Sequence, residues 1–427
     1  MLNICLIGVS GFAAIHYEDV LRQVASGRMR LLGATIINPS EEAEKCRVLR
    51  ELGCRVFSDY RAMLSALAGR VDLCVIPTGL HLHAEMTVQA LRAGANVLVE
   101  KPAAATIQDV RAMQKAEVAA QRFVAVAYQN AYASETLWMK RAILDGEIGA
   151  LRCVKTRCLW SRAAPYYARN EWAGRLRVAR GEREVWVLDS PFHNAVAHQL
   201  NMIAFLAGTQ WNRSAALESV QAELYRAQEI ESPDTTALRA VTREGVRLLF
   251  LATHCPQGSL NPEIEVRGEK GRILWTGERT LIERADGSRE ERPSQGGQAL
   301  RDAMWNAVAR RVHDPDSLIC DLENAAAQVL CANGAHDSSP VHPINARFVR
   351  RENHSAGLKT IIQGVDESVA RAFEREQLWS ELGVPWAKAG QVVRLAEYNH
   401  FPRPRAELTS LELSAEAVNK ARGFACV

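Results

Sequence analysis

Short apolar runs alternate with helix-length amphipathic segments through the first 127 residues, and this alternation restricts the fold more than any other feature of the chain. Continuous apolar strands separated by helices are typical of a parallel sheet that is covered on both faces. Because crossovers between parallel strands are right-handed, residues 1–127 are predicted to form a doubly wound α/β domain. The apolar runs cover residues 3–9, 31–37, 71–77, 95–100 and 123–128.

The pattern changes after about residue 130. A helical segment over 134–149 leads into residues 151–160, which alternate like a strand, and several strand-like runs separated by turn signals follow between 215 and 285. This pattern predicts an α/β domain with an open, mainly antiparallel sheet over residues 128–385, including helices at 298–312 and 320–334. Residues 386–427 are predicted to form a C-terminal extension that packs loosely.

Composition excludes several classes of protein. The chain is 48% hydrophobic and 24% charged with a net charge of +3, so nothing indicates a nucleic-acid partner. No apolar run approaches the ~18–20 residues of a membrane span, and the N-terminus lacks a signal-peptide pattern. The 10 cysteines are scattered without a C-x-x-C pair, so we expect reduced thiols in a cytoplasmic protein. No cluster of Cys, His and carboxylates predicts a metal site.

A glycine-containing loop, "IGVSGFAAIH", follows the first predicted strand and opens the first helix. In the dinucleotide pattern G-x-G-x-x-G it keeps Gly8, replaces the other glycines with Ser10 and Ala13, and adds Gly11. Small residues let a pyrophosphate approach the free N–H groups of a helix N-terminus. We therefore expect cofactor contacts from these residues and Phe12, although a plain turn between strand and helix has the same pattern.

The second predicted strand ends at "ATIINPS", where dinucleotide folds often carry an acid for the adenosine ribose. This chain has Asn38 there, and an amide can bond ribose hydroxyls without repelling a 2′-phosphate. Glu41 and Glu42 follow, and no arginine is adjacent. The sequence therefore favours NAD, with NADP as the alternative.

The motif "VEKPAAAT" follows the strand predicted over 95–100, and it contains Glu100 and Lys101. Upstream, Thr78 and His83 fit a T-P-x-x-x-H element in which Gly79 replaces the proline. Together these elements resemble the glucose–fructose oxidoreductase/inositol dehydrogenase (Gfo/Idh/MocA) family. The likeness runs through the N-terminal domain and, more loosely, to about residue 335.

The resemblance implies a Rossmann domain joined to an α/β domain whose exposed sheet face forms homodimers or homotetramers. It also implies a nicotinamide cofactor and a sugar, sugar acid or cyclitol as substrate, with no nucleic acid or membrane partner. Lys101 matches the family lysine that hydrogen-bonds the reacting hydroxyl or carbonyl. Thr78, His83 and Glu100 are then expected at the cofactor, because ligands bind at the carboxyl edge of a parallel sheet.

Two histidines lie in "LDSPFHNAVAHQLNM", residues 188–202. Ser190 as N-cap and a proline after it predict the start of a helix. On such a helix Asn194 and His198 share one face, whereas His193 points about 100° away from Asn194.

The family pattern at this place is Asp-x-x-x-His-x-x-Asp, in which the histidine is the general acid and base. The distance to "FLAG" at 205–208 aligns that histidine with His198 and replaces both acids with Asn194 and Asn201. Our hypothesis is that His198 transfers the proton with the help of Lys101, while Asn194 holds its tautomer or contacts the substrate. For His193 a purely structural role in the core is favoured.

The segment over residues 158–186 is dense in arginine and aromatic residues and precedes the predicted catalytic helix. Aromatic faces suit sugar rings, and arginine binds carboxylate, sulfate or phosphate. A solvent-exposed loop with surface arginines would have the same composition. The candidate substrate contacts here are Arg162, Tyr166, Tyr167, Trp172 and Arg175.

Three functions are compatible with these residues. The first is an NAD(P)-dependent oxidoreductase acting on a sugar-like alcohol or ketone. The second is an NAD-dependent glycoside hydrolase that works by transient oxidation and elimination. The third is a non-catalytic regulator that binds dinucleotide or sugar. Lys101 and His198 favour an enzyme, whereas Ser10, Ala13 and Asn194 keep the regulator open.

Overall fold

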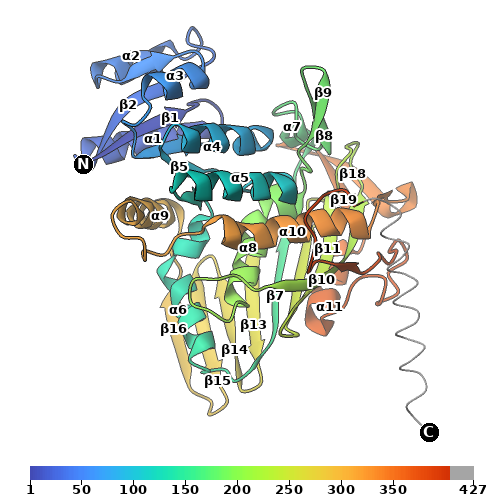
Figure 1. The fold of residues 1–427 in the computed structure, drawn as a ribbon. Helices are drawn as coiled ribbons and strands as arrows, with labels where there is room; N and C mark the ends of the chain where they lie inside the picture. The colour runs from blue at the N-terminus through green and yellow to red at the C-terminus, as the bar shows by residue number, and fades with distance from the viewer. Residues whose placement is uncertain (404–427) are drawn as a thin grey trace.

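The computed structural model describes residues 1–403, and two large β-sheets dominate these residues (Figure 1). The N-terminal sheet has six parallel strands in the order β3-β2-β1-β4-β5-β6. The order reverses between β1 and β4, and doubly wound sheets bind ligands beyond such a reversal. The strands are β1 (Leu2–Ile7), β2 (Met29–Thr35), β3 (Arg55–Phe57), β4 (Leu73–Ile76), β5 (Asn96–Val99) and β6 (Val124–Val126).

The predicted doubly wound domain is confirmed, because each predicted apolar run overlaps one of these strands. All four residues of β4 and all three of β6 are buried, as the continuous apolar runs required. The short edge strand β3 was not predicted, because none of its three residues is fully buried and its first is an exposed arginine. The helices of this domain are α1 (Ala13–Ala25), α2 (Ala43–Glu51), α3 (Tyr60–Ala66), α4 (His83–Arg92) and α5 (Ile107–Ala120), with a 3-10 turn, η1 (Leu80–Leu82).

The second sheet has ten strands within the described residues, in the order β16-β15-β14-β13-β7-β12-β11-β10-β17, with β20 beside β10. Its neighbours are antiparallel except for β7 with β12 and β10 with β17, so the predicted mainly antiparallel sheet is confirmed. The strands are β7 (Leu151–Leu159), β10 (Leu217–Arg226), β11 (Thr235–Thr242), β12 (Arg247–Thr253), β13 (Leu260–Gly268), β14 (Gly271–Thr276), β15 (Arg279–Arg284), β16 (Arg289–Pro293), β17 (Val341–Pro343) and β20 (Val393–Arg394).

Helices α8 and α10 pack on one face of this sheet, between it and the N-terminal domain (Figure 1). Two hairpins project from the sheet domain, β8–β9 and β18–β19. The bounds are α6 (Ser134–Leu144), α7 (Ala164–Tyr167), α8 (Ala197–Leu206), α9 (Gly297–Arg311), α10 (Leu322–Ser338), α11 (Val365–Arg375), η2 (Gln129–Tyr132), η4 (Ala346–Phe348), β8 (Arg177–Arg180), β9 (Arg183–Trp186), β18 (Val349–His354) and β19 (Gly357–Ile362).

Two buried polar residues join the domains. Asp19 of α1 is fully buried, and it accepts hydrogen bonds from Arg301 (Nε to Oδ2, 3.1 Å) and Trp305 (Nε1 to Oδ2, 3.3 Å) of α9. Asn333 of α10 accepts from the first N–H of α5, on Ile107 (2.8 Å), and donates to Ala105 O (2.9 Å). Because each buried group is paired, these contacts fix the orientation of the two domains instead of leaving unsatisfied polar atoms.

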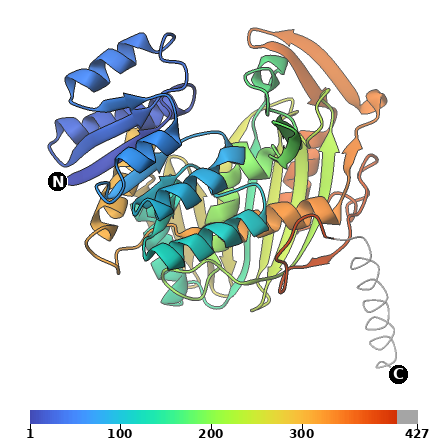
Figure 2. The same ribbon diagram turned by 45° about the horizontal axis from the view of Figure 1, so that its top comes forward.

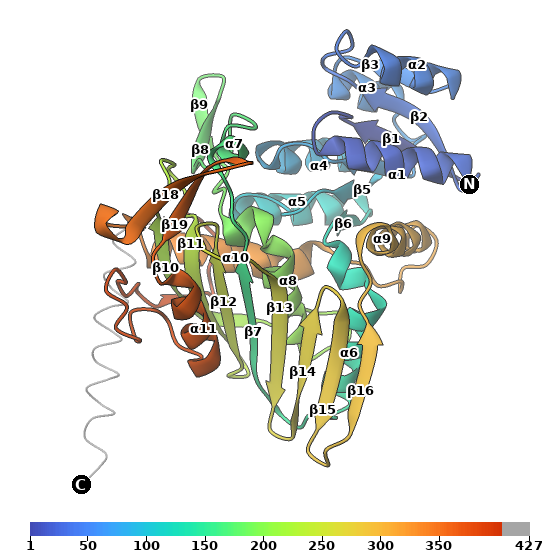
Figure 3. The ribbon, with the colours of Figure 1, turned by 180° about the vertical axis from the view of Figure 1, so that it is seen from behind.

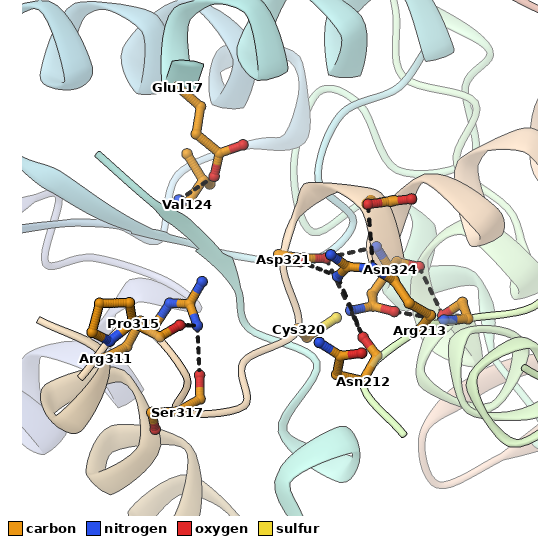
Figure 4. Close-up of polar contacts among 12 residues, drawn as sticks. Glu117, Val124, Asn212, Arg213, Arg311, Pro315, Ser317, Cys320, Asp321 and Asn324 are labelled. Carbon is orange, nitrogen blue, oxygen red and sulfur yellow. Dashed lines mark hydrogen bonds and ion pairs between the residues drawn. The ribbon is translucent and has the colours of Figure 1, made fainter. Parts of the chain in front are cut away.

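A further polar cluster surrounds the start of α10 (Figure 4). Asp321 caps the helix by accepting from Asn324 N (2.8 Å), and it forms an ion pair with Arg213 (2.8 Å). The neighbouring Cys320 O accepts from a backbone N–H of β6, and Glu117 of α5 accepts from Val124 N (2.8 Å). The cluster thereby connects the loop after α8, the start of α10 and the last strand of the N-terminal sheet.

The C-terminal part of the described chain covers one half of the outer face of the second sheet. Helix α11 and residues 378–386 pack mainly on β7, β10, β11 and β12 and reach the edge of β13, while β14 to β16 extend beyond them (Figure 3). Trp379 is fully buried, and its ring centre lies 5.9 Å from that of Tyr225 and 5.2 Å from that of Trp386. This apolar layer forms a second hydrophobic core on the side opposite α8 and α10.

The described part of the predicted extension, residues 386–403, packs firmly instead of loosely. Strand β20 pairs with β10, Tyr398 bonds Asp337, and Phe401 lies edge-on to Trp186 at 5.0 Å. The proline and arginine content of this segment gave no sign of its five buried apolar side chains, Trp386, Val393, Leu395, Tyr398 and Phe401. Residues 404–427 of the predicted extension lie outside the described residues.

The β18–β19 hairpin, drawn in orange at the top of Figure 2, packs against α7. A Cβ at Gly357 would lie 2.7 Å from Pro165 Cδ, so the hairpin backbone directly supports this short helix. None of the helices within residues 1–403 is long and apolar enough to cross a membrane. The nine cysteines in the same range are all free and buried.

Candidate active site

A first cleft, here called the loop cleft, has a volume of about 510 Å³ at the carboxyl ends of β1, β2 and β4. The glycines of its loop have left-handed backbones, with φ of +99° at Gly8 and +59° at Gly11, which residues with a side chain rarely adopt. Six of the predicted cofactor contacts line this cleft: Gly8, Ser10, Phe12, Ala13, Asn38 and Thr78.

The loop cleft fits a dinucleotide. Backbone N–H groups of Gly11 and Phe12 precede α1 and find no acceptor within residues 1–403, so they are open to an anion. At the other end, Asn38 donates to Glu41 (Nδ2 to Oε2, 2.8 Å), and Asp59 also lines the wall. Two carboxylates at this end favour ribose hydroxyls over a 2′-phosphate.

A second cavity of about 540 Å³, here called the lysine pocket, shares part of its wall with the loop cleft. It brings together predicted residues of both domains, from the motif after β5 and from the segment before α8. The shared residues are Phe12, Thr78, Asn170 and Trp172. The other lining residues are Gly11, Leu80, His83, Glu100, Lys101, Pro102, Tyr166, Arg169, His193 and Asn194.

Lys101 is anchored across the domain boundary. Its Nζ donates to Asn194 O (2.8 Å) and to Asn194 Oδ1 (3.3 Å). An ammonium group has three N–H donors, so one remains for an oxygen in the pocket. Burial lowers the pKa of Lys101 below its usual value, and the charges of Glu100 and Asp189 oppose that shift.

Glu100 is held by a histidine that the sequence analysis did not single out. His16 of α1 bonds Glu100 (Nε2 to Oε1, 2.8 Å), and the other oxygen of Glu100 accepts from Lys101 N (2.9 Å). Burial alone would raise the pKa of Glu100, but the hydrogen bond with His16 and the charge of Lys101 hold it below its usual value. Helix α1 and the motif after β5 are thereby locked together.

His83 is a buried connector between two loops. Its Nδ1 donates to Pro102 O (2.9 Å), and its Nε2 lies 3.0 Å from Thr78 O. The side chain is 1% exposed, so it reaches the pocket only as part of its wall. The histidine of the predicted T-P-x-x-x-H element therefore fixes the turn after β4 against the motif that carries Lys101.

An acid does lie beside Asn194, which replaces an acid of the family pattern. This acid is Asp189. Its Oδ1 accepts from Asn194 Nδ2 (2.8 Å) and its Oδ2 from Gly174 N (2.7 Å). The preceding residue, Leu188, is fully buried with φ of +49°, a strained conformation that the surrounding core must hold. Asp189, Asn194 and Lys101 thus form a hydrogen-bonded chain with the amide between acid and ammonium. Burial raises the pKa of Asp189, and its two hydrogen bonds oppose this.

The helix predicted to start at Ser190 differs from the observed one. Residues Pro191–Ala195 form a π-helical turn, Val196 leaves helical geometry with φ of −118°, and α8 starts at Ala197. Ser190 Oγ donates to Leu188 O instead of capping the turn. A π-helical turn is wider than an α-helical turn, and Val196 interrupts the helix after it. Asn194 and His198 therefore do not lie on one face of a regular α-helix. Asn201 is buried against Asn324 O (3.4 Å), far along α8.

His193 lines the lysine pocket, in contrast to its predicted core role, and it is also fully buried. Gln328 Nε2 donates to Phe192 O (2.8 Å), which fixes the amide, and lies 3.1 Å from His193 Nδ1. Nδ1 is then the acceptor, so the ring proton is on Nε2, which has no partner within the described residues. Burial lowers the pKa of His193 to about 3, so the ring is neutral.

His198 is half-buried and does not line the lysine pocket. Its ring lies edge-on to Tyr128, with 5.6 Å between centres, and its Nδ1 is buried without a partner within residues 1–403. Burial and the charge of Lys101 lower the pKa of His198 to about 3. A sequence signal for the other histidine existed: Asp189 and His193 have the same Asp-x-x-x-His spacing as the family pattern.

The predicted substrate contacts separate into three groups. Tyr166 and Trp172 line the lysine pocket, together with Arg169, which was not predicted. Arg162 lies near the Tyr166 ring (4.9 Å to its centre) without lining the pocket, and its Nε is buried without a partner within residues 1–403. Arg175 is paired with Glu231 (3.2 Å) in a separate groove, and Tyr167 donates to or accepts from His254 (3.0 Å). In the same range no group of three His, Cys, Asp or Glu could hold a metal ion.

Two family models cover most of the two domains. The model described as "Oxidoreductase family, NAD-binding Rossmann fold" (GFO_IDH_MocA) matches residues 2–128. The model described as "GFO/IDH/MocA C-terminal domain" matches residues 136–274. The chain belongs to the Gfo/Idh/MocA family. This Gfo/Idh/MocA protein is an oxidoreductase with an NAD-binding Rossmann domain, as the motif around Lys101 predicted.

Named relatives are dehydrogenases. An inositol 2-dehydrogenase of Klebsiella pneumoniae is 26% identical over 274 residues, which cover 62% of this Gfo/Idh/MocA chain and 72% of the relative. An inositol dehydrogenase homolog of Azotobacter vinelandii, solved with NAD+, has a TM-score of 0.65 at 18% identity and covers 78% of this chain and 95% of its own. The WlbA dehydrogenase of Bordetella pertussis, solved with NADH and UDP-GlcNAcA, has a TM-score of 0.62 at 23% identity, covering 79% and 97%.

Proposed function

We propose that this protein is an NAD-dependent dehydrogenase that interconverts a hydroxyl and a carbonyl on a sugar, sugar acid or cyclitol. The observation that supports it is the meeting of Lys101, Asn194 and His193 in one pocket that shares part of its wall with the loop cleft. Relatives named inositol 2-dehydrogenase support a polyhydroxylated substrate. The free, buried cysteines support a reducing compartment such as the cytoplasm.

The cofactor would lie along the loop cleft. Gly8, Ser10 and Ala13 would hold its diphosphate at the start of α1, and Asn38 would bond the adenosine ribose. Glu41 and Asp59 beside that ribose support NAD over NADP. When bound, the nicotinamide supplies hydride transfer to or from the substrate carbon.

Lys101 would hydrogen-bond the oxygen at the reacting carbon and transfer its proton. Its third N–H would donate to the oxygen of the reacting carbon, and its lowered pKa makes the neutral amine accessible. In oxidation the neutral amine accepts the hydroxyl proton as the hydride leaves the carbon, and in reduction the ammonium returns it. Asp189 acts through Asn194 by keeping the amide oxygen directed at Nζ.

We propose His193, not His198, as the histidine that contacts the reacting oxygen. The Nε2–H of His193 has no partner within residues 1–403, and Gln328 favours this tautomer. A neutral imidazole with a fixed N–H polarises a carbonyl and stabilises negative charge on its oxygen. His198 does not line this pocket, and its ring packs edge-on against Tyr128.

A panel of sugars, sugar acids and cyclitols, assayed for NAD reduction, tests this function. We expect a rise in nicotinamide absorbance with at least one of them. Aryl glycosides that release their aglycone only with cofactor, and with no net absorbance change, would instead identify the glycoside hydrolase. Tight cofactor binding with neither reaction would identify the non-catalytic regulator.

A further inference from the structure

Arg169 places an unneutralised cation on the wall of the lysine pocket. Its guanidinium lies over the Tyr166 ring, 3.8 Å from the ring centre, and 5.2 Å from that of Trp172. Nη1 of Arg169 donates to Tyr166 O (2.5 Å). No Asp or Glu within residues 1–403 forms an ion pair with it, although its side chain lines the pocket.

Other arginines of the same segment do have carboxylate partners. Arg175 pairs with Glu231 at 3.2 Å, and Arg177 of β8 is 3.5 Å from Glu184. Arg180 reaches across to Glu85 of the N-terminal domain at 2.6 Å. Arg162 and Arg183 have no carboxylate partner within residues 1–403 either, but neither lines the lysine pocket. Arg169 is thus the arginine of this segment that combines an unpaired charge with a place on the pocket wall.

The stacked arginine is prepared to bind a planar anion. Contact with the Tyr166 ring and the bond to the Tyr166 carbonyl hold the guanidinium plane, while the remaining N–H groups are free for a ligand. A fixed guanidinium fork matches the geometry of a carboxylate and forms charge-assisted hydrogen bonds with it. The buried acid Asp189 interacts with the charge of Arg169, but its oxygens accept from Gly174 N and Asn194 Nδ2 and it forms no ion pair with the arginine.

The position of Arg169 shows which anion it can bind, the cofactor diphosphate or a carboxylate of the substrate. Arg169 lines the lysine pocket but not the loop cleft, whose glycine loop meets the cofactor. We propose that the substrate carries a carboxylate, which Arg169 binds while Lys101 holds the oxygen of the reacting carbon. This inference rests on the proposed dehydrogenase function and makes the substrate a sugar acid instead of a neutral sugar or cyclitol.

Binding of matched sugars to the complex of the full chain with NADH tests the inference. Glucose and glucuronate differ only in the C6 carboxylate, and glucose 6-phosphate carries a phosphate there. By calorimetry we expect glucuronate to bind at least about tenfold more tightly than the other two, as one charge-assisted contact predicts. Arg169→Gln should remove the difference and leave glucose binding unchanged, whereas the matched control Arg175→Gln should retain it.

Three results would overturn the inference. One is equal binding of glucose and glucuronate by the wild type, or tighter binding of glucose 6-phosphate. Another is a preference for glucuronate that survives Arg169→Gln. The last is weaker NADH binding in Arg169→Gln with unchanged glucuronate binding, which would assign the arginine to the cofactor diphosphate. Affinity is measured without turnover. Tight glucuronate binding without hydride transfer would therefore reject the proposed dehydrogenase function but not the binding of a carboxylate by Arg169.

Discussion

The pKa of Lys101 depends on Asp189, although the two side chains are not in contact. The charge of Asp189 raises the pKa of Lys101 against the lowering effect of burial, and Asn194 connects them. In the proposed mechanism oxidation needs the neutral amine, so its rate should rise with pH up to the pKa of Lys101, below its usual 10.5.

Asp189→Asn should move that pH profile to lower pH. The variant removes a negative charge that favours the ammonium, so the neutral amine is reached earlier. The pH dependence of kcat/KM for substrate oxidation measures the shift. Glu231→Gln, which removes an exposed acid outside the pocket, is the control. A profile that moves to higher pH, or does not move, would contradict the proton role of Lys101.

Glu117 makes a separate contribution to stability. Burial raises its pKa from 4.5 to about 7, with its carboxyl accepting from Val124 N. A carboxyl whose pKa is higher in the folded than in the unfolded state stabilises the fold below the unfolded value, and this stability is lost as pH rises through about 7.

Glu117→Gln keeps an acceptor for Val124 N but cannot ionise. The free energy of unfolding should therefore fall less between about pH 4.5 and 7 in the variant than in the wild type. Urea unfolding across this range measures the difference, with the exposed residue Glu51 changed to Gln as control. Parallel curves for the wild type and Glu117→Gln would show that the carboxyl is ionised in the folded state.

At the residue scale, the sequence predicted only part of the site. Lys101 and Thr78 were predictable because each follows a buried strand directly, so strand position fixes them. Asp189 and His193 have the acid and the spacing of the family pattern, but alignment by the distance to residues 205–208 selected His198, because the π-turn at Pro191–Ala195 cannot be recognised in the sequence. Arg169 could not be separated from its neighbours either, since pairing with an acid is a tertiary property.

Helix α10 links the elements on which the site is built. It carries Gln328 beside His193, Asn333 beside the start of α5, and Asp321 as its N-cap. The cap residue also receives Arg213 from the loop after α8, as Figure 4 shows. Because both domains bond to this helix, its first turn affects the stability of their junction.

Asp321→Ala should lower the free energy of unfolding by about 1–2 kcal/mol, since it removes an N-cap and a partly exposed ion pair. Chemical denaturation measures the loss. The control is Glu323→Ala on the exposed side of the same turn, which should cost less. Equal losses in both variants would show that the cap adds nothing to the stability of the helix.

At the element scale, the strands of the sheets were easier to predict than the segments that pack on them. The apolar runs of β1 to β6 and the alternation of β7 locate strands from local sequence alone. The segment from β18 to β20 gives a weaker signal, because an anchor such as Trp379 is isolated among polar residues. Its burial depends on a sheet face formed more than 100 residues earlier in the chain.

At the scale of the whole molecule, the segment that covers part of the second sheet restricts which surface can form an interface between copies of the chain. Family resemblance led us to expect dimers or tetramers through the second sheet, but α11 and residues 378–386 occupy the face of β7 and β10–β12. Strands β14 to β16 extend beyond this cover (Figure 3), and Phe373 of α11 borders the groove around Leu274 and Leu281. We therefore expect association through β14 to β16, around Leu274 and Leu281.

Leu281→Arg tests this interface. The wild type should show about twice the mass of the chain by light scattering, and the variant the mass of one chain, because a charge replaces an apolar contact. The matched control is Leu358→Arg, an exposed leucine on β19 away from the sheet face, which should leave the mass unchanged. A wild-type monomer, or a dimer that persists in Leu281→Arg, would rule out this interface.

The central claim is that Lys101 and the nicotinamide act on one substrate carbon. Transfer of deuterium from a substrate labelled at that carbon into NAD, followed in single turnovers, tests it most directly. We predict transfer by the wild type and a rate at least about 10²-fold lower in Lys101→Arg, which keeps the charge but cannot accept a proton. Deuterium that never reaches the nicotinamide, or transfer at the wild-type rate in Lys101→Arg, would contradict it.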